Sequence, residues 1–167
     1  MRSGGAIAGL EQRKKEIAML QAQYRAEGRL TNRTQFLRQT DDFKQHLREG
    51  GSLDEILSEV FAVFKEAAHT VLGQDATPEQ VMAALAIHAG RAIEMEPSEG
   101  KTLSIAMAAY LHALTGRGVH IHTFNDLLAA RDTQAMAKVL HFLGLSVGVR
   151  LDNNQSFLFD HTLCCQK

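Results

Sequence analysis

The sequence predicts an α/β fold in which a βαβαβ parallel sheet follows an all-helical N-terminal extension. Two kinds of observation support this prediction. A glycine-containing turn at 99–102 joins an apolar segment to a helix-prone run, and strand-like segments at 119–124 and 146–151 alternate with helices. Such alternation is typical of parallel strands joined by crossover helices. We expect the extension to occupy residues 1–76 and the sheet-containing domain to occupy residues 77–167.

Helices are predicted throughout the first ninety residues. Apolar side chains recur at helical spacing along the charged stretch 12–27, and a second, weaker pattern at 36–47 ends at a glycine pair. Ser52 then precedes Glu55 by three residues, which is the spacing of a capping box, and the next helix extends to about Val71.

A fourth helix is predicted to begin at Thr77. This threonine is placed to cap the first turn, Pro78 suits the first helical position, and Gln80 stands where a capping glutamine belongs. The helix is expected to end near a glycine at position 90.

After residue 90 the pattern changes. Short apolar segments, one with clear period-two alternation, indicate strands, whereas longer runs, one of them capped by Asn125, indicate helices. The predicted order is a strand at 91–96, a helix at 101–114, a strand at 119–124, a helix at 126–143 and a strand at 146–151.

Glu99-Gly100-Lys101-Thr102 is the most informative stretch of the chain. A strand, a glycine turn, a lysine, a threonine and a helix form the phosphate site of a P-loop NTPase. Backbone N–H groups and the helix N-terminus bind phosphates, the lysine reaches the outer phosphates, and the threonine hydroxyl holds Mg²⁺. The strict pattern requires a glycine that this chain lacks, and a looser form has glycine where this chain has Ser98. The motif predicts a P-loop NTPase-like domain that binds ATP and Mg²⁺, with Thr102 holding the metal through the nucleotide.

Composition and charge limit the function classes. The net charge of −1 gives no overall attraction to nucleic acid. The first fifty residues carry ten Lys and Arg against six Asp and Glu, so the N-terminal helix either contacts anionic lipid or an acidic partner, or is a solvated helical face. The sequence has no apolar run long enough to span a bilayer and no apolar core of a signal peptide, and its two cysteines are neighbours. We therefore expect a cytoplasmic protein.

Several segments read together are more specific than the phosphate motif alone. They are Glu59–Val63, Glu66-Ala67, Ile93–Met95, Glu99–Leu103, Tyr110–His120, Asn125-Asp126, Arg131-Asp132 and Phe142–Gly148. Together they resemble SecA, the ATPase motor of bacterial protein export, over about residues 52–150. The resemblance implies the N-terminal, ATP-binding part of that motor.

The resemblance also implies roles for individual residues. Gln80 falls where the family's glutamine reads the adenine edge, although the capping role explains the same residue equally well. The phosphate loop corresponds to Ser98, Glu99, Gly100, Lys101 and Thr102, with the lysine on phosphate and the threonine on Mg²⁺.

Four further residues, Asn125, Asp126, Arg131 and Asp132, fall in the family's next helicase block, which lines the motor cleft. A helix cap is the alternative explanation of Asn125. For Arg131 and Asp132, a surface ion pair is the alternative to a role in the motor cleft.

Departures from the family weaken the predicted site. Pro97-Ser98 replaces Thr-Gly, which removes one N–H donor and adds a Cβ, while Asp75 and Thr77 replace a basic and an aromatic residue. No apolar strand ends in the Asp-Glu pair that positions water for hydrolysis. The segment Phe157–Asp160 either supplies one carboxylate or, with Asn153–Gln155, matches a later family segment brought closer by a deletion.

Two main functional hypotheses follow. In the first, the chain contributes half of the motor cleft for ATP-driven preprotein translocation, with the preprotein and the SecYEG membrane channel as partners and the inner face of the plasma membrane as a peripheral location. In the second, it is a catalytically inactive SecA-like binding or regulatory module. A P-loop kinase is a third alternative, but only scattered arginines follow the motif. Whether the chain is an enzyme stays open, and we expect a fragment or a reduced relative of the motor.

Overall fold

The computed structural model describes residues 3–96, 99–152 and 156–159, and most of these residues are helical. The elements are α1 (Ser3–Ala26), α2 (Arg33–Arg48), α3 (Leu53–Leu72), α4 (Pro78–His88), α5 (Lys101–Ala113), α6 (Asp126–Phe142), β1 (Gly148–Arg150) and β2 (Ser156–Leu158). Every helix predicted from the sequence is present, and α1 begins earlier than predicted.

Local hydrogen bonds explain where several helices begin. The Ser52 hydroxyl accepts a hydrogen bond from the Glu55 N–H, and the Glu55 carboxylate accepts one from the Ser52 N–H. Thr77 and Gln80 form the same reciprocal pair at the start of α4. The side chain of Asn125 caps α6. These capping predictions are confirmed.

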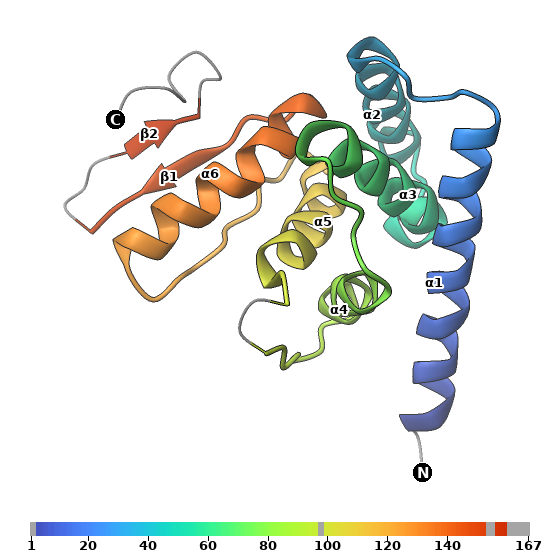
Figure 1. Cartoon of the computed structure of the whole chain (residues 1–167), viewed down its shortest axis with the longest axis horizontal. Coiled ribbons are helices and arrows are strands. Elements are labelled where there is room, and N and C mark those ends of the chain that lie inside the picture. The colour runs from blue at the N-terminus through green and yellow to red at the C-terminus, as the bar shows by residue number, and fades with distance from the viewer. Residues whose placement is uncertain (1–2, 97–98, 153–155, 160–167) are drawn as a thin grey trace.

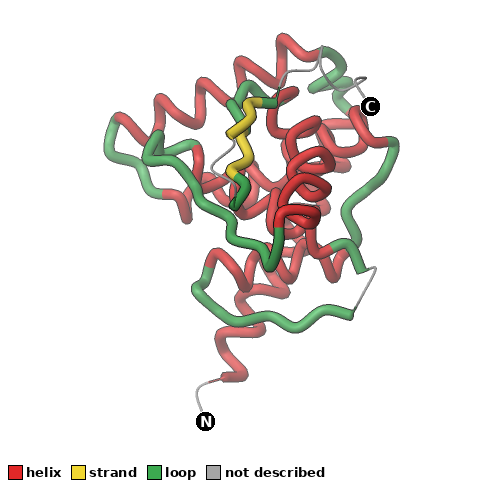
Figure 2. Tube along the Cα trace, turned by 90° about the vertical axis from the view of Figure 1, so that its left-hand side faces the viewer, coloured by secondary structure: helices red, strands yellow, loops and turns green. Residues whose placement is uncertain are grey.

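α3 lies at the centre of the helical assembly and contacts α1, α2, α5 and α6. In Figure 1, α1 runs along one side of the molecule, while α6 and the β1–β2 pair lie on the opposite side. Figure 2 shows that helices make up most of the trace and that the strands form one short pair. α4 packs against both α5 and α1, which brings its N-terminus close to that of α5.

The buried core is built around α3 and α5. Phe64 of α3 and Tyr110 of α5 have no exposed surface, and their ring centroids are 6.0 Å apart. The Tyr110 hydroxyl is hydrogen-bonded to the Thr40 hydroxyl of α2 at 2.7 Å. Burial raises the pKa of Tyr110 far above its usual value, because the phenolate would lose its hydration. The core therefore links three helices through both apolar and polar contacts.

The core is continuous along the chain. It extends from Ile17 of α1 to Leu143 at the end of α6. It also includes Ala76 and Val81, which lie on either side of the boundary expected between residues 76 and 77. The N-terminal helices and the following helices thus bury their apolar faces against one another.

The parallel sheet predicted from the sequence is absent from the described residues. The segments 91–96 and 119–124 are loops, and of the three predicted strands only 146–151 contains a strand, β1. β1 pairs with β2 in antiparallel register, with Val149 opposite Phe157. The prediction of an α/β, P-loop NTPase-like fold with a βαβαβ parallel sheet is therefore wrong for this structure.

The reason for this difference is the lack of pairing partners. A strand is stable only when a neighbour satisfies its backbone groups, and no described segment pairs with 119–124. The period-two pattern is still there, but Val119 and Ile121 are each 39% exposed and Phe124 is fully exposed. The alternation is a local signal, whereas the sheet it indicates depends on distant residues.

In the described part of the chain, no helix is both long enough and apolar enough to cross a membrane.

Candidate functional site

A cavity of about 480 Å³ lies where the loop after α3, the N-termini of α4 and α5, and the second half of α6 meet. Its apolar wall consists of Leu72, Leu103, Ala135, Met136 and Val139. Its polar wall consists of Gln74, Asp75, Thr77, Gln80, Gly100 and Thr102. Three residues of the predicted site therefore line one cavity, although they come from different helices.

Gln80 joins two sides of this cavity. Its side-chain oxygen accepts a hydrogen bond from the Thr77 N–H at 3.1 Å, and its side-chain nitrogen donates to the Glu99 carbonyl oxygen at 2.8 Å. The first bond is the capping role predicted from the sequence. The second ties α4 to the glycine turn, and neither helical periodicity nor the phosphate motif indicates it.

Gly100 is required by the backbone at this turn. It is the N-cap of α5 with a φ of 81°, a left-handed conformation that is costly for residues with a Cβ. A Cβ added at Gly100 would also overlap the amide nitrogen of Gln80. The glycine thus permits both the turn and the close approach of the glutamine.

Lys101 and Thr102 begin α5, as the motif predicts. The Lys101 side chain is exposed, whereas Thr102 is partly buried. The Thr102 hydroxyl donates to Asp132 Oδ1 of α6 at 3.4 Å. Arg131 donates to the same oxygen through Nε at 2.9 Å and through one terminal nitrogen at 2.8 Å. The first turn of α5 and the predicted Arg-Asp pair are therefore in direct contact.

The other predicted site residues lie at or beyond the edge of this arrangement. Asn125 caps α6, and the Asp126 carboxylate accepts a hydrogen bond from the Asp152 N–H at 2.9 Å. Neither lines the cavity. Ser98 lies outside the described residues, as do Pro97 and the predicted segment Asn153–Gln155.

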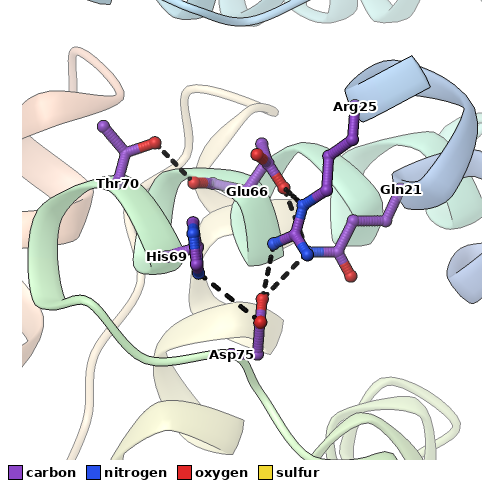
Figure 3. A network of polar contacts seen from close by, with 6 residues as sticks. All are labelled: Gln21, Arg25, Glu66, His69, Thr70 and Asp75. Carbon is purple, nitrogen blue, oxygen red and sulfur yellow. Dashed lines mark hydrogen bonds and ion pairs between the residues drawn. The ribbon is translucent and has the colours of Figure 1, made fainter.

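A polar network supports the cavity wall on the side of α1 (Figure 3). Arg25 donates to Asp75 at 2.6 Å and to Glu66 at 2.8 Å. Gln21 donates to the same two carboxylates at 3.2 and 3.1 Å, and His69 lies 3.4 Å from Asp75. The network fixes the loop after α3 to α1, and this loop carries several cavity residues.

The charges of the network explain the shifted pKa values of its members. The hydrogen bond from Arg25 holds the pKa of Asp75 below its usual value. The same hydrogen bond raises the pKa of Arg25. Local sequence patterns do not indicate this contact, because fifty positions separate Arg25 from Asp75. The only hint was that Asp75 replaces a basic residue of the family it resembles.

Thr102 lines the cavity and contacts Asp132, which lies beside it, and these two oxygen donors suit a hard cation that arrives with phosphate. No group of three or more His, Cys, Asp or Glu side chains within the described ranges could hold a metal ion alone. Thr102 and Asp132 nevertheless present a hydroxyl and a carboxylate in contact with each other. Mg²⁺ commonly takes one or two carboxylates and completes its shell with substrate phosphates and water. The residues present therefore fit Mg²⁺ bound through a nucleotide.

Comparison with known proteins places these features in a family. Residues 6–158 match the SecA DEAD-like domain. The chain is 50% identical over 121 residues to the protein translocase subunit SecA of Thermodesulfovibrio yellowstonii, a match that covers 72% of this chain and 14% of the relative. It is 42% identical over 152 residues to the protein translocase subunit SecA 1 of Corynebacterium diphtheriae, covering 91% of this chain and 17% of the relative.

The chain thus spans less than a fifth of the length of these relatives. The matched region includes α2 to α6, the glycine turn and the contact between Thr102 and Asp132. With a family match over most of its length and a relative half identical to it, the chain belongs to the SecA family.

Proposed function

We propose that this chain binds ATP with Mg²⁺ and forms the N-terminal nucleotide-binding part of a SecA protein-export motor. The observation that carries the proposal is the cavity of about 480 Å³ at the glycine-capped N-terminus of α5, where Lys101 and Thr102 stand beside it. The N–H groups of a helix N-terminus, a lysine and a hydroxyl at one place are the elements of a phosphate site.

Each wall of the cavity has a distinct task in this proposal. The apolar side chains Leu72, Met136 and Val139 accept the face of the base. Lys101 reaches the outer phosphates, and its exposed side chain is free to move toward them. Thr102 holds Mg²⁺, which when bound neutralises phosphate charge. For Gln80 to read the adenine edge, it must release the Glu99 carbonyl, so base recognition competes with an existing hydrogen bond.

Translocation is proposed only for the longer motor. The preprotein and the SecYEG channel are then its partners, and the location is cytoplasmic, at the inner face of the plasma membrane. A contact of α1 with anionic lipid is a further part of this proposal, because the exposed Lys15 lies along the helix between the exposed apolar residues Ile7 and Met19. We propose no binding to nucleic acid.

One observation favours the second hypothesis, a SecA-like binding or regulatory module without catalysis. The bond from Gln80 to Glu99 closes the glycine turn against α4. A turn held in this way is stable without phosphate. A module of this kind would retain the fold and the cavity but bind nucleotide weakly.

The test is calorimetric titration of the whole chain with Mg²⁺-ATP. Removing a charge-assisted phosphate contact costs about 1.5–3 kcal/mol of binding free energy. Lys101→Ala should therefore lower an already weak affinity by about tenfold or more, below the detection limit of calorimetry. Lys138→Ala is the matched control, since Lys138 is exposed on α6 and does not line the cavity. Equal affinities for wild type and Lys101→Ala would remove Lys101 from the site, and absence of binding to wild type would favour the module.

A further inference from the structure

Asp75 places a negative charge in the wall of the cavity. Among the described residues that line the cavity, Asp75 alone has a charged side chain. Its pKa lies below the usual value, so the carboxylate is ionised near neutral pH. Gly100 and Thr102, at the proposed phosphate end, line the same cavity. Because Mg²⁺-ATP keeps a net negative charge, a carboxylate without a cation in this wall would weaken its binding.

Arg25 of α1 compensates this charge from outside the cavity. Its guanidinium lies between two carboxylates, 2.6 Å from that of Asp75 and 2.8 Å from that of Glu66 (Figure 3). Arg25 does not line the cavity. Any effect of Arg25 on a ligand in the cavity must therefore act through Asp75.

The formal charges around Arg25 are balanced. Lys65 is the second cation, since it is buried in α3 and interacts electrostatically with Asp75 and Glu66. Two cations thus face two carboxylates. His69, 3.4 Å from Asp75, adds a charge only when it is protonated. Removal of Arg25 would therefore leave one net negative charge beside the cavity.

A second ion pair fixes α1 to α3 away from the cavity. Arg13 donates to the backbone oxygen of Asp54 at 2.9 Å and to its carboxylate at 3.4 Å, in the first turn of α3. Neither residue lines the cavity. Arg13 and Arg25 therefore both join α1 to α3, but only Arg25 acts on a charge in the cavity wall.

We propose that Arg25 is a positioning residue of the nucleotide site. It neutralises Asp75 in the cavity wall, so docking of α1 and binding of an anionic ligand favour each other. This inference rests on the proposed function, because the ligand is the nucleotide. By reciprocity, bound nucleotide strengthens the docking of α1. The alternative is a purely structural role, in which Arg25 only holds α1 and the loop after α3 together.

The experiment titrates the whole chain with a fluorescent ATP analogue and Mg²⁺ at low salt and about pH 8, where an ordinary histidine is neutral. Arg25→Met should weaken binding by about threefold to tenfold, because the uncompensated charge repels the ligand within the cavity. Arg13→Met is the matched control and should bind within about twofold of wild type, since it uncovers no charge in the cavity wall. Added KCl should shrink the effect of Arg25→Met, because salt screens charges.

Removing the charge of Asp75 separates compensation from a structural role. Asp75→Asn keeps an oxygen that accepts from Arg25, and it should bind the nucleotide at least as tightly as wild type. The double variant of Arg25→Met with Asp75→Asn should regain wild-type affinity. In denaturant unfolding it should still be destabilised, because Glu66, whose side chain is 11% exposed, lacks its cation. A double variant that binds as weakly as Arg25→Met overturns the inference.

The remaining outcomes separate this inference from the proposed function. If wild type binds no Mg²⁺-nucleotide, the proposed function fails and this inference fails with it. If wild type binds and Arg25→Met binds equally well at low salt, nucleotide binding stands and the role of Arg25 is overturned. Asp75→Asn retains Arg25, so weaker binding by this variant overturns the inference even where Arg25→Met does not fold.

Discussion

Single residues decide whether the glycine turn forms, and Gly100 is the clearest case. Its φ of 81° disfavours a side chain, and a Cβ added there would also displace the amide nitrogen of Gln80. The first is a property of the backbone, and the second is a contact. Substitutions can therefore separate them.

Gly100→Ala should lower the free energy of unfolding by about 1–3 kcal/mol, the cost of a non-glycine residue in the left-handed region plus the overlap with Gln80. In the double variant with Gln80→Ala, the overlap is absent. The loss in free energy of unfolding then comes only from the left-handed backbone at position 100 and from the lost helix cap. Urea unfolding of the four proteins of this cycle gives the coupling energy. Strict additivity would contradict the contact.

At the scale of elements, polar contacts between helices hold the walls of the cavity in place. Arg25 of α1 reaches both Glu66 of α3 and Asp75 of the following loop. His88 of α4 lies 3.3 Å from His112 of α5 through their ring nitrogens. The two contacts behave differently, because one joins opposite charges and the other joins two bases.

Arg25→Met should destabilise the chain by about 1–3 kcal/mol, because it leaves the Glu66 carboxylate, whose side chain is only 11% exposed, without its cation. Arg38→Met, at an exposed position of α2, is the control and should change stability by less than about 0.5 kcal/mol. Denaturant unfolding measures both. Equal midpoints for the two variants would show that the network adds no net stability.

The histidine pair predicts weaker stability in acid. Burial, and next the charge of His88, lower the pKa of His112 in the folded chain. Protonation therefore favours the unfolded state, and stability is lost as the pH falls through the unfolded value of about 6.5 toward the lower folded value. The groups facing the pair are Asp54 at 3.7 Å from His88, and Arg13, which contacts Asp54.

His112→Gln should flatten this part of the pH profile. Thermal unfolding of wild type and variant, followed from about pH 7.5 to about pH 5, makes the comparison around the unfolded pKa. Parallel profiles would show that His112 does not contribute to the acid sensitivity.

Local signals in the sequence predicted the helices and their caps, and they failed for the sheet. Ser52 with Glu55 and Thr77 with Gln80 act within one turn of helix, so their spacing is sufficient. The alternation at 119–124 is just as clear, but a strand requires a partner from elsewhere. The same contrast holds for the site. The motif locates Lys101 and Thr102 from local sequence, whereas the Gln80–Glu99 and Thr102–Asp132 hydrogen bonds depend on tertiary packing.

At the scale of the whole molecule, one continuous core runs through all six helices of the described chain. The sequence contains two tyrosines and no tryptophan. Tyr24 of α1 is 3% exposed and Tyr110 of α5 is fully buried, so both phenols belong to this core. Burial raises the pKa of each phenol.

The absorbance of these two phenols can therefore be used to follow unfolding of the chain. Ionisation is favoured in the unfolded state, so stability should be lost as the pH rises above the unfolded value of about 10. In an alkaline titration, phenolate absorbance should therefore increase together with the loss of helical circular dichroism, in one cooperative step. Phenolate absorbance that rises while the helices stay intact would show that at least one ring reaches solvent without unfolding. Any event that loosens α1 or α5 should be visible through these rings alone, without an added dye.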